Sequence, residues 1–338
     1  MNIQVKEDDL IDKLMNNKSY IFVLVLTILL SLSFLHAQPT DKDSSSGKIV
    51  TCFKNLNGSS EWRLVERVKQ NFQTYHPQGM VKIGDYIYLT SVEKIVTPQR
   101  LAPSQDGYDR TPGKGIGHLF KIDLDGNLID HITLGEGTVY HPGGIDYDGK
   151  YIWCPVAEYR PNSKSIIYRI HPDSLIAHKT FHFDDHIGAI VYNRTNDSLH
   201  GMSWGSRRFY VWTKEQWTEA ARSNHIPKYE IKLNGNHYIG YQDCHYAGDN
   251  YALCSGLRNY VIPGAGKISF GGIDLLDLEQ HVAVHQIPVY LWVKPHLVMS
   301  NNPFFVELIN EHLRFYFIPE DDDSTLYIYE IINLQNQF

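Results

Sequence analysis

The chain has 338 residues, of which 43% are hydrophobic and 20% are charged, and its formal net charge at pH 7 is −7. This balance is typical of a soluble globular body. The negative charge, without a basic stripe along the sequence, argues against a nucleic-acid partner because little would neutralise the phosphates. The 22 tyrosines and 14 phenylalanines favour strands over helices.

Residues 20–35 are almost wholly apolar and follow a polar segment of mixed charge, 1–19. The apolar run is shorter than a membrane span, which needs about 20 residues, and Ala37 offers a small residue at a plausible cleavage point. We therefore expect residues 1–37 to be a signal peptide, which would make the protein secreted or periplasmic. The alternative is a retained signal anchor, which would tether the protein to a membrane with its body outside the cytoplasm. No other contact with a membrane is expected.

Residues 38–60 include three consecutive serines and are expected to form a flexible linker, so that the folded domain spans 61–338. No linker-like break interrupts that domain. After export, the four cysteines would lie in an oxidising compartment, where disulfide bonds can form but are not required. Cys244 and Cys254 flank one predicted hairpin and could face each other across it, although buried free thiols are the expected state.

The domain alternates strand-like runs with tight turns, and the sequence predicts one helix at 214–222. Four strand-like segments follow His76, at 79–83, 86–95, 118–124 and 128–134. Similar units follow, and a fifth unit supplies only three strands, which segment 62–68 can complete. We therefore predict an all-β fold, a single β-propeller of five four-stranded blades closed by the N-terminal strand. Two packed sheets are the alternative architecture.

Polar residues recur at one position of each unit. In a four-stranded blade, the entrance to the first strand and the end of the second lie at the same end, so these positions converge on one face. The entrance residues are His76, His141, His186, Asp243 with His245, and Asn301 with Asn302. The second strands end in Glu93, Glu158 with Arg160, Trp204 with Arg207, Arg258, and Glu320. The sequence thus predicts a rim of imidazoles, carboxylates and guanidiniums around the channel mouth.

The rim has two interpretations. Neutral imidazole nitrogens are suited to zinc, iron or manganese, so the histidines of four blades could hold a divalent metal ion, with Glu93 or Glu158 moving protons. The metal ligands would be His76, His141, His186 and His245. Alternatively, a histidine at a strand entrance hydrogen bonds the backbone of a neighbouring blade, and the glutamates are solvated or pair with arginines.

Three motif matches do not carry the function. Gly201–Gly205 fits G-x-S-x-G, but the chain continues into a strand rather than a helix, so Ser203 is not expected to be a nucleophile. The glycine-rich stretch 113–117 precedes a strand and is expected to give mobility to an insertion, 94–117, whose Tyr108 and Arg110 could cover the rim. The acidic run 320–323 lacks the spacing of a calcium loop and is expected to be a solvated turn.

Several segments resemble those of a mostly exported family of unknown function, and the resemblance extends from about Trp62 to the C-terminus. These segments are His76–Gly79, His141–Asp146, Pro155–Ser163 and Ser203–Tyr210. The resemblance implies a propeller and brings no established activity. The chain is similar to gluconolactonase-like and strictosidine-synthase-like propellers in architecture only. The lactonases use acidic and amide metal ligands, whereas this rim is rich in histidine.

The leading hypothesis is an exported propeller enzyme, a metal-assisted hydrolase or lyase acting on a small polar or carbohydrate-like molecule. In this hypothesis, the substrate contacts are Arg160, Trp204, Arg207, Asp243, Arg258 and Asn301. The alternative is a ligand-binding protein of the cell envelope that uses the same rim without turnover. A third possibility is a scaffold that binds partners through its outer faces.

Overall fold

The computed structural model describes residues 44–332, except 224, 265 and 295. The expected signal peptide and its cleavage site lie outside the described residues. From Ser45 onward the described residues form one compact unit. No helix within the described ranges is long and apolar enough to cross a membrane.

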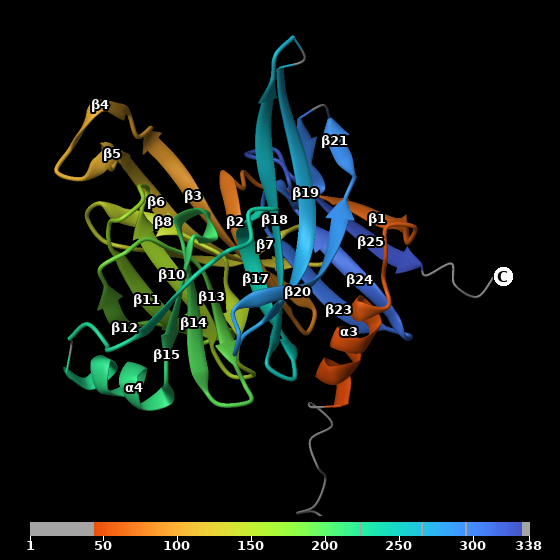
Figure 1. Cartoon of the computed structure of the whole chain (residues 1–338), viewed down its shortest axis with the longest axis horizontal. Coiled ribbons are helices and arrows are strands. Elements are labelled where there is room, and N and C mark those ends of the chain that lie inside the picture. The colour runs from red at the N-terminus through yellow and green to blue at the C-terminus, as the bar shows by residue number, and fades with distance from the viewer. Residues whose placement is uncertain (1–43, 224, 265, 295, 333–338) are drawn as a thin grey trace, which may run out of the picture. The chain divides into compact units, whose positions relative to one another are not determined.

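Five antiparallel sheets in the described residues form the blades of a propeller (Figure 1). The first blade contains β2 (His76–Ile83), β3 (Tyr86–Val96), β6 (Lys114–Asp123) and β7 (Leu128–Leu134). The second contains β8 (Val139–Pro142) and β9 (Asp146–Tyr147), then β10 (Ile152–Glu158), β11 (Ser165–Ile170) and β12 (Ala177–Phe183). The third contains β13 (Ile187–Asn193), β14 (Ser198–Ser203), β15 (Arg208–Trp212) and β16 (Glu230–Leu233).

The last two blades complete the ring. The fourth contains β17 (Gly240–Gly248), β18 (Tyr251–Ile262), β19 (Gly266–Asp277) and β20 (Val282–Val289). The fifth contains β23 (Phe304–Ile309), β24 (His312–Phe317), β25 (Thr325–Ile332) and β1 (Glu61–Lys69). Because β1 pairs with β25, the N-terminal strand closes the last blade. The predicted five-bladed propeller is confirmed.

Burial along the strands follows from their place in a blade. Every residue of β10 is buried, because a second strand is covered by neighbouring blades on both faces. Every residue of β16, an outer strand, is exposed. The predicted turn between β6 and β7 also forms: the Asp123 carboxylate accepts the backbone N–H of Asn127 at 2.8 Å, and Gly126 has a φ of +84°.

The predicted helix is also present, as α4 (Lys214–Ser223). Thr213 and Gln216 cap its start reciprocally: the Gln216 Oε1 accepts the Thr213 N–H at 2.9 Å, and the Thr213 hydroxyl accepts the Gln216 N–H at 3.4 Å. The buried Trp217 then packs edge-on against Trp153, with ring centroids 5.2 Å apart. The helix therefore covers the third blade and its neighbour.

The structure differs from the expected linker over residues 44–60. Helix α3 (Ser44–Lys54) occupies this stretch, and Val50, Phe53 and Leu56 are buried in the core between the fourth and fifth blades. The imidazole of His285 contacts the ring of Phe53 edge-on and lies 2.8 Å from the carbonyl of Leu56. Three well-spaced apolar side chains therefore attach the segment to the propeller, even though its serines suggest flexibility.

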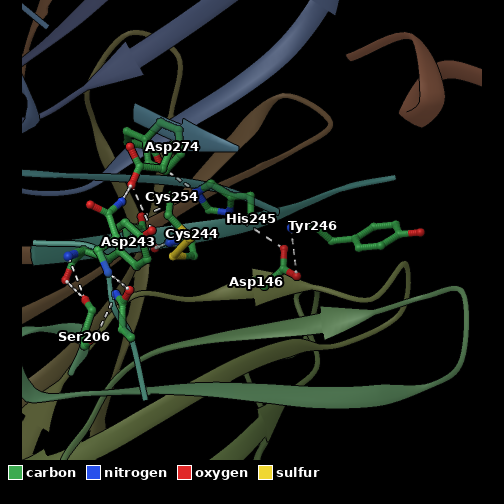
Figure 2. The surroundings of a disulfide bond; sticks show 12 residues. Asp146, Ser206, Asp243, Cys244, His245, Tyr246, Cys254 and Asp274 are labelled. Carbon is green, nitrogen blue, oxygen red and sulfur yellow. Dashed lines mark hydrogen bonds and ion pairs between the residues drawn. A yellow bond between two sulfur atoms is a disulfide. The ribbon is translucent and has the colours of Figure 1, made fainter. Parts of the chain in front are cut away.

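The cysteines also depart in part from expectation. Cys244 and Cys254 form a disulfide between β17 and β18 (Figure 2), because the register sets them directly opposite each other, with Cα atoms 4.1 Å apart. All four cysteines are described, and Cys52 and Cys154 are free thiols.

A buried polar cluster on the inner strands ties the blades together (Figure 2). Asp243 of the fourth blade accepts the backbone N–H of Met80 in the first blade at 2.9 Å and that of Ile145 in the second at 3.1 Å. Asp146 of the second blade accepts the N–H of Tyr192 in the third at 3.0 Å. The two carboxylates thus replace hydrogen bonds that the backbone cannot make within its own sheet.

His245 completes the cluster and reaches the fifth blade. Its Nε2 lies 2.7 Å from the carbonyl oxygen of Phe304 and 3.5 Å from Asp243 Oδ2, and its Nδ1 lies 3.7 Å from Asp146 Oδ1. Burial alone would lower the pKa of His245, but the charge of Asp243 and the closeness of Asp146 outweigh it and raise the pKa to about 10. The imidazolium therefore lies between two buried carboxylates.

Replacing Phe53 tests whether α3 belongs to the fold. We expect Phe53→Ala to lower the free energy of unfolding by about 3–5 kcal/mol, because it leaves a cavity in a closed core. Urea unfolding followed by circular dichroism measures this, with the exposed Thr51→Ala on the same helix as the control. Equal stability of both variants and the wild type would show that the segment is a linker.

Replacing His245 tests the axial cluster. We expect His245→Ala to lower the free energy of unfolding by about 3–5 kcal/mol, because two buried carboxylates lose their partner. The folded pKa lies above the unfolded value, so the stabilisation is complete below about pH 6.5 and is lost as the pH rises toward about 10. Wild-type stability should therefore fall between these pH values, and the fall should be absent in the variant. The exposed His178→Ala should leave both stability and its pH profile unchanged.

Candidate functional site

A cavity of about 230 Å³ opens at one end of the inner strands and is built from four blades. Its lining includes the entrance histidines of three blades and the aromatic residues that follow. The lining residues are His76, Gln78, His141, Tyr159, His186, Gly188, Ser203, Trp204, Gly205, Tyr241 and Gln242. Three of the four predicted metal-binding histidines are thus brought to one cavity, while His245 lies in the axial cluster.

The three imidazoles are neighbours. The ring centroid of His141 lies 6.4 Å from that of His76 and 5.7 Å from that of His186. Each flanking ring is oriented by an acceptor outside the cavity: His76 Nδ1 lies 2.8 Å from the Asp321 carboxylate, and His186 Nδ1 lies 2.7 Å from the backbone carbonyl of Glu158. Because a carbonyl only accepts, His186 Nδ1 carries the proton, and Nε2 of the neutral ring keeps its lone pair.

The central imidazole has the opposite environment. His141 is buried, and neither of its ring nitrogens has a hydrogen-bond partner among the described residues. Burial, reinforced by the neighbouring His186 and His76, holds the pKa of His141 well below its usual range. Burial likewise lowers the pKa of His186 to about 4. Both rings are therefore neutral at pH 7, with lone pairs available to a ligand.

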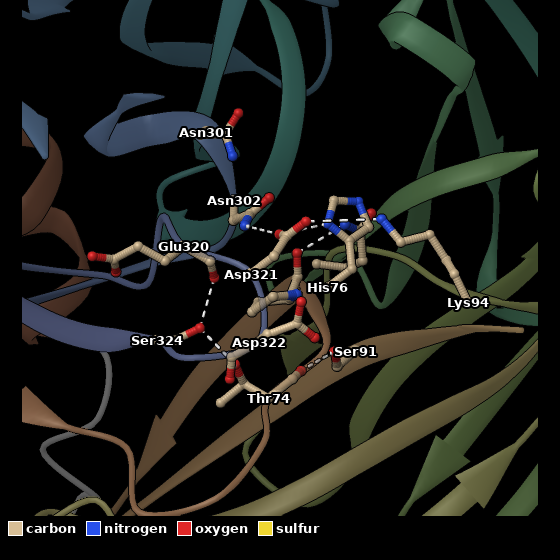
Figure 3. A network of polar contacts seen from close by, with 12 residues as sticks. Thr74, His76, Ser91, Lys94, Asn301, Asn302, Glu320, Asp321, Asp322 and Ser324 are labelled. Atoms are coloured by element: carbon tan, nitrogen blue, oxygen red, sulfur yellow. Dashed lines mark hydrogen bonds and ion pairs between the residues drawn. The ribbon is translucent and has the colours of Figure 1, made fainter. Parts of the chain in front are cut away.

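Asp321 belongs to the site, although the sequence suggested only a solvated turn at 320–323. Its carboxylate binds His76, accepts a hydrogen bond from Asn302 at 3.2 Å, and lies 3.8 Å from the Lys94 ammonium (Figure 3). Burial raises the pKa of Asp321, but His76, Asn302 and Lys94 together bring it below its ordinary value. Asp321 is thus an ionised partner for His76, at the end of the second strand of the fifth blade.

Aromatic rings form the wall beside the imidazoles. Tyr159 lies 4.1 Å from His141, and Trp204 meets His186 edge-on at 4.7 Å, measured between ring centroids. The two aromatic rings are themselves 5.9 Å apart. The cavity therefore combines lone-pair nitrogens with flat apolar faces, a combination that suits a small molecule with polar groups on a carbon ring or chain.

The insertion between β3 and β6 contributes to the rim. It forms a hairpin of β4 (Arg100–Gln105) and β5 (Tyr108–Arg110). The guanidinium of Arg110 lies 4.8 Å from the centre of the Trp204 ring, and that of Arg160 lies 3.5 Å from the centre of the Tyr108 ring. The structure thus places both residues that were predicted to cover the rim against residues of the rim.

The two predicted proton-transfer glutamates face other partners. Glu93 Oε2 lies 3.2 Å from His118 Nε2, and His118 in turn stacks on Tyr75. The buried carboxylate of Glu158 accepts a hydrogen bond from Arg160 Nε at 2.7 Å and another from the Thr138 hydroxyl. Neither glutamate is among the residues that line the cavity, so their predicted role in proton transfer stays a prediction.

Part of the predicted set of substrate contacts lines the cavity, and the rest does not. Trp204 lines the cavity. Arg207 donates to the carbonyls of Gly205 at 2.8 Å and Asn236 at 2.9 Å. The exposed Arg258 lies near Arg207. The pKa of Arg207 is lowered mainly by its burial and also by the positive charge of Arg258.

Two other predicted contacts, Asn301 and Asp243, do not line the cavity. Asn301 donates to the carbonyl of Pro319 at 3.1 Å, and Asp243 lies in the axial cluster. Ser203 also lines the cavity, at the end of β14, and its hydroxyl accepts the Arg208 N–H at 2.9 Å. The 3-10 turn Trp204–Ser206 leads from Ser203 into β15, so the setting of a nucleophile elbow is absent there, as expected.

The predicted metal site can be compared with this geometry. In the described part of the chain, no group of three or more His, Cys, Asp or Glu side chains stands as a set that could hold a metal ion. The donor chemistry of the three cavity imidazoles nevertheless fits a metal, because ligating histidines ordinarily give their second ring N–H to a carboxylate or a backbone carbonyl. The four-histidine metal site stays a prediction.

The chain shows low-identity similarity to several solved structures. The chain is similar to an exo-1,5-α-L-arabinanase from a bovine ruminal metagenomic library, at 9% identity and a TM-score of 0.47 over 80% of this chain and 97% of the other. The chain is also similar to a mannose phosphorylase from Leishmania mexicana, in complex with phosphate ion, at 9% identity and a TM-score of 0.47 over 80% of this chain and 89% of the other. Its similarity to the WD40 β-propeller domain of Doa1 is at 7% identity and a TM-score of 0.38 over 79% of this chain and 96% of the other.

A search of curated proteins finds no match. A family model, described as a family of unknown function (DUF6454), matches residues 40–334. This range takes in every blade and the segment that precedes them. The chain therefore belongs to the family of unknown function DUF6454.

Proposed function

We propose that the channel-mouth cavity is the active site of a hydrolase or lyase that acts on a small polar or carbohydrate-like molecule, assisted by a divalent metal ion. His76, His141 and His186 would hold the ion. The observation that carries the proposal is His141, a buried neutral imidazole whose two nitrogens have no partner among the described residues. An unpaired buried polar group is unfavourable unless a ligand completes it.

The surroundings of the other two imidazoles support the same assignment. Asp321 holds His76 through Nδ1, and the Glu158 carbonyl holds His186 through Nδ1. Both Nε2 atoms are thereby left for a ligand when the rings are neutral. A divalent ion at these nitrogens would polarise a substrate oxygen or activate a water molecule.

The protein's own groups would position the substrate. Trp204 and Tyr159 offer ring faces on which an apolar face of the substrate can rest. The side-chain amides of Gln78 and Gln242 line the same cavity and can both donate and accept hydrogen bonds. Arg110 lies over the Trp204 ring while Asp109 accepts two hydrogen bonds from its guanidinium at 2.9 Å, so the pair covers the aromatic wall and leaves little free charge for an anionic substrate.

Recognition without turnover is the second candidate function. The aromatic wall and the guanidinium favour it, because they need no metal ion to bind a ligand, and the two predicted proton-transfer glutamates have other partners. In either case the protein would work outside the cytoplasm, as the apolar segment 20–35 suggests. The two functions separate on whether the imidazoles bind a metal ion.

Metal content tests the enzyme. We expect the chain from residue 38, expressed without a histidine tag, to retain about one zinc, iron or manganese ion after dialysis. His141→Ala should lose it, because the central imidazole is removed, whereas the exposed His178→Ala should retain it. Elemental analysis gives the ratio for each variant. A folded wild type without metal after loading would assign the cavity to ligand recognition instead.

The pH dependence of stability of the metal-free protein tests the neutral state of His186. Its folded pKa of about 4 lies below the unfolded value of about 6.5, so stabilisation is complete above about pH 6.5 and is lost as the pH falls toward about 4. The difference corresponds to about 3 kcal/mol. His186→Asn, which can keep a donor toward the Glu158 carbonyl, should show less loss of stability in urea unfolding between these pH values. An unchanged slope would show that His186 titrates normally.

A further inference from the structure

A second surface, unrelated to the imidazole cavity, gathers exposed apolar side chains on the fourth blade. The long hairpin of β18 and β19 projects beyond the rest of its sheet (Figure 1), beside the short hairpin of β21 (Trp292–Lys294) and β22 (Leu297–Val298). We call its exposed apolar residues the hairpin patch: Tyr260, Val261, Ile262, Phe270, Tyr290 and Trp292. Val261 is 83% exposed and Trp292 is 45% exposed, which is unfavourable in water.

Four residues of the hairpin patch, Tyr260, Phe270, Tyr290 and Trp292, line a cleft of about 520 Å³, and three polar side chains of its lining already have hydrogen-bond partners. Tyr238 donates its hydroxyl to the Gly271 carbonyl at 3.2 Å, and Tyr290 donates to that of Ser60 at 3.1 Å. The indole N–H of Trp292 lies 3.3 Å from the Ser269 carbonyl. The cleft therefore presents mainly carbon and ring faces. A sugar needs hydrogen-bond partners beside such rings, whereas an apolar chain does not.

The segments that carry the hairpin patch are rich in cations relative to the acidic chain as a whole. The chain carries a net charge of −7, yet residues 251–273 and 281–306 contain no aspartate or glutamate. These ranges include the exposed cations Arg258, Lys267 and Lys294. Exposed cations on the same segments as exposed tyrosine and tryptophan are complementary to anionic lipid headgroups, because aromatic rings favour the membrane interface and basic side chains favour an anionic leaflet.

We propose that the hairpin patch docks the protein on the surface of an anionic lipid bilayer. The aromatic and aliphatic side chains would enter the interface, and the three cations would lie at the headgroups. This contact is separate from the N-terminal segment, which was the only membrane contact expected from the sequence. It is also independent of the proposed catalysis, since its residues do not line the imidazole cavity.

Docking would also orient the cavity. β18 pairs with β17 from Tyr251 to Leu257 and then continues alone with β19 to Ile262. The paired end of β17 contains Tyr241 and Gln242, which line the cavity. The hairpin therefore rises from the same end of the fourth blade as the cavity mouth, and a docked protein would present that mouth toward the membrane.

Vesicle co-sedimentation tests the proposal. The chain from residue 38 is used, because the apolar segment 20–35 would itself enter vesicles and the described residues from Ser45 form a compact unit. We expect binding to vesicles of equal parts phosphatidylcholine and phosphatidylglycerol, weaker binding to phosphatidylcholine alone, and further weakening between about 0.1 M and about 1 M salt. The double variant Val261→Asp, Ile262→Asp should bind at least about tenfold more weakly.

Matched controls make the outcome decisive. The double variant Ile231→Asp, Leu233→Asp adds the same two negative charges at exposed sites on β16, where Leu233 is 79% exposed, and it should bind vesicles like the wild type. His141→Ala should also bind normally, so that loss of the cavity chemistry and loss of docking are distinguishable. Failure of the folded wild type to bind anionic vesicles would overturn the proposal, as would equal binding by the double variant. A dimer in solution that this variant dissociates, without vesicle binding, would assign the hairpin patch to self-association.

Discussion

The ring depends on two buried carboxylates and the imidazolium between them. Blades of a propeller are separate sheets, so their inner strands cannot satisfy every backbone N–H within one sheet, and the channel admits no neighbouring strand. Asp243 and Asp146 take up N–H groups from neighbouring blades, and His245 balances their charge while meeting the carbonyl of Phe304. An apolar axis would pack the blades equally well but would leave these backbone groups unpaired. The polar axis therefore fixes the angular position of each inner strand.

That fixed geometry explains why the cavity keeps neutral imidazoles. The entrance histidines cannot withdraw into solvent, because the strands that carry them are held at the axis, and burial then disfavours the protonated ring. The pKa of His245 shifts in the opposite direction. His245 lies in an equally buried position, but the two adjacent carboxylates reverse the direction of its pKa shift. His141 and His245 both come from a blade entrance, yet they take opposite charge states. The charged His245 stabilises the ring, and the neutral His141 is available to a ligand.

The sequence predicted the propeller because alternation within strands, turn residues and the unit length are local properties. Helix α3 was missed because its serines suggested a linker, while Val50 and Phe53 reveal their role only against the fourth and fifth blades. The gathering of His76, His141 and His186 followed from blade topology alone. Blade topology did not predict where the side chains of Glu93 and Glu158 point, because at a strand end a shift of one residue in register turns a side chain to the other face. Asp321 was missed because its partner, His76, lies 245 positions away in the chain.

The fourth blade links the two surfaces for which we propose functions. Its strand β17 lines the imidazole cavity, and its strand β18 extends into the hairpin patch, with the Cys244–Cys254 disulfide joining the two strands beside the axial Asp243. A covalently joined strand pair transmits displacement better than hydrogen bonds alone, since its two strands cannot slide past each other. The cavity wall at Tyr241 and Gln242 and the base of the hairpin therefore belong to one cross-linked strand pair, which fixes both surfaces at the same end of the fourth blade.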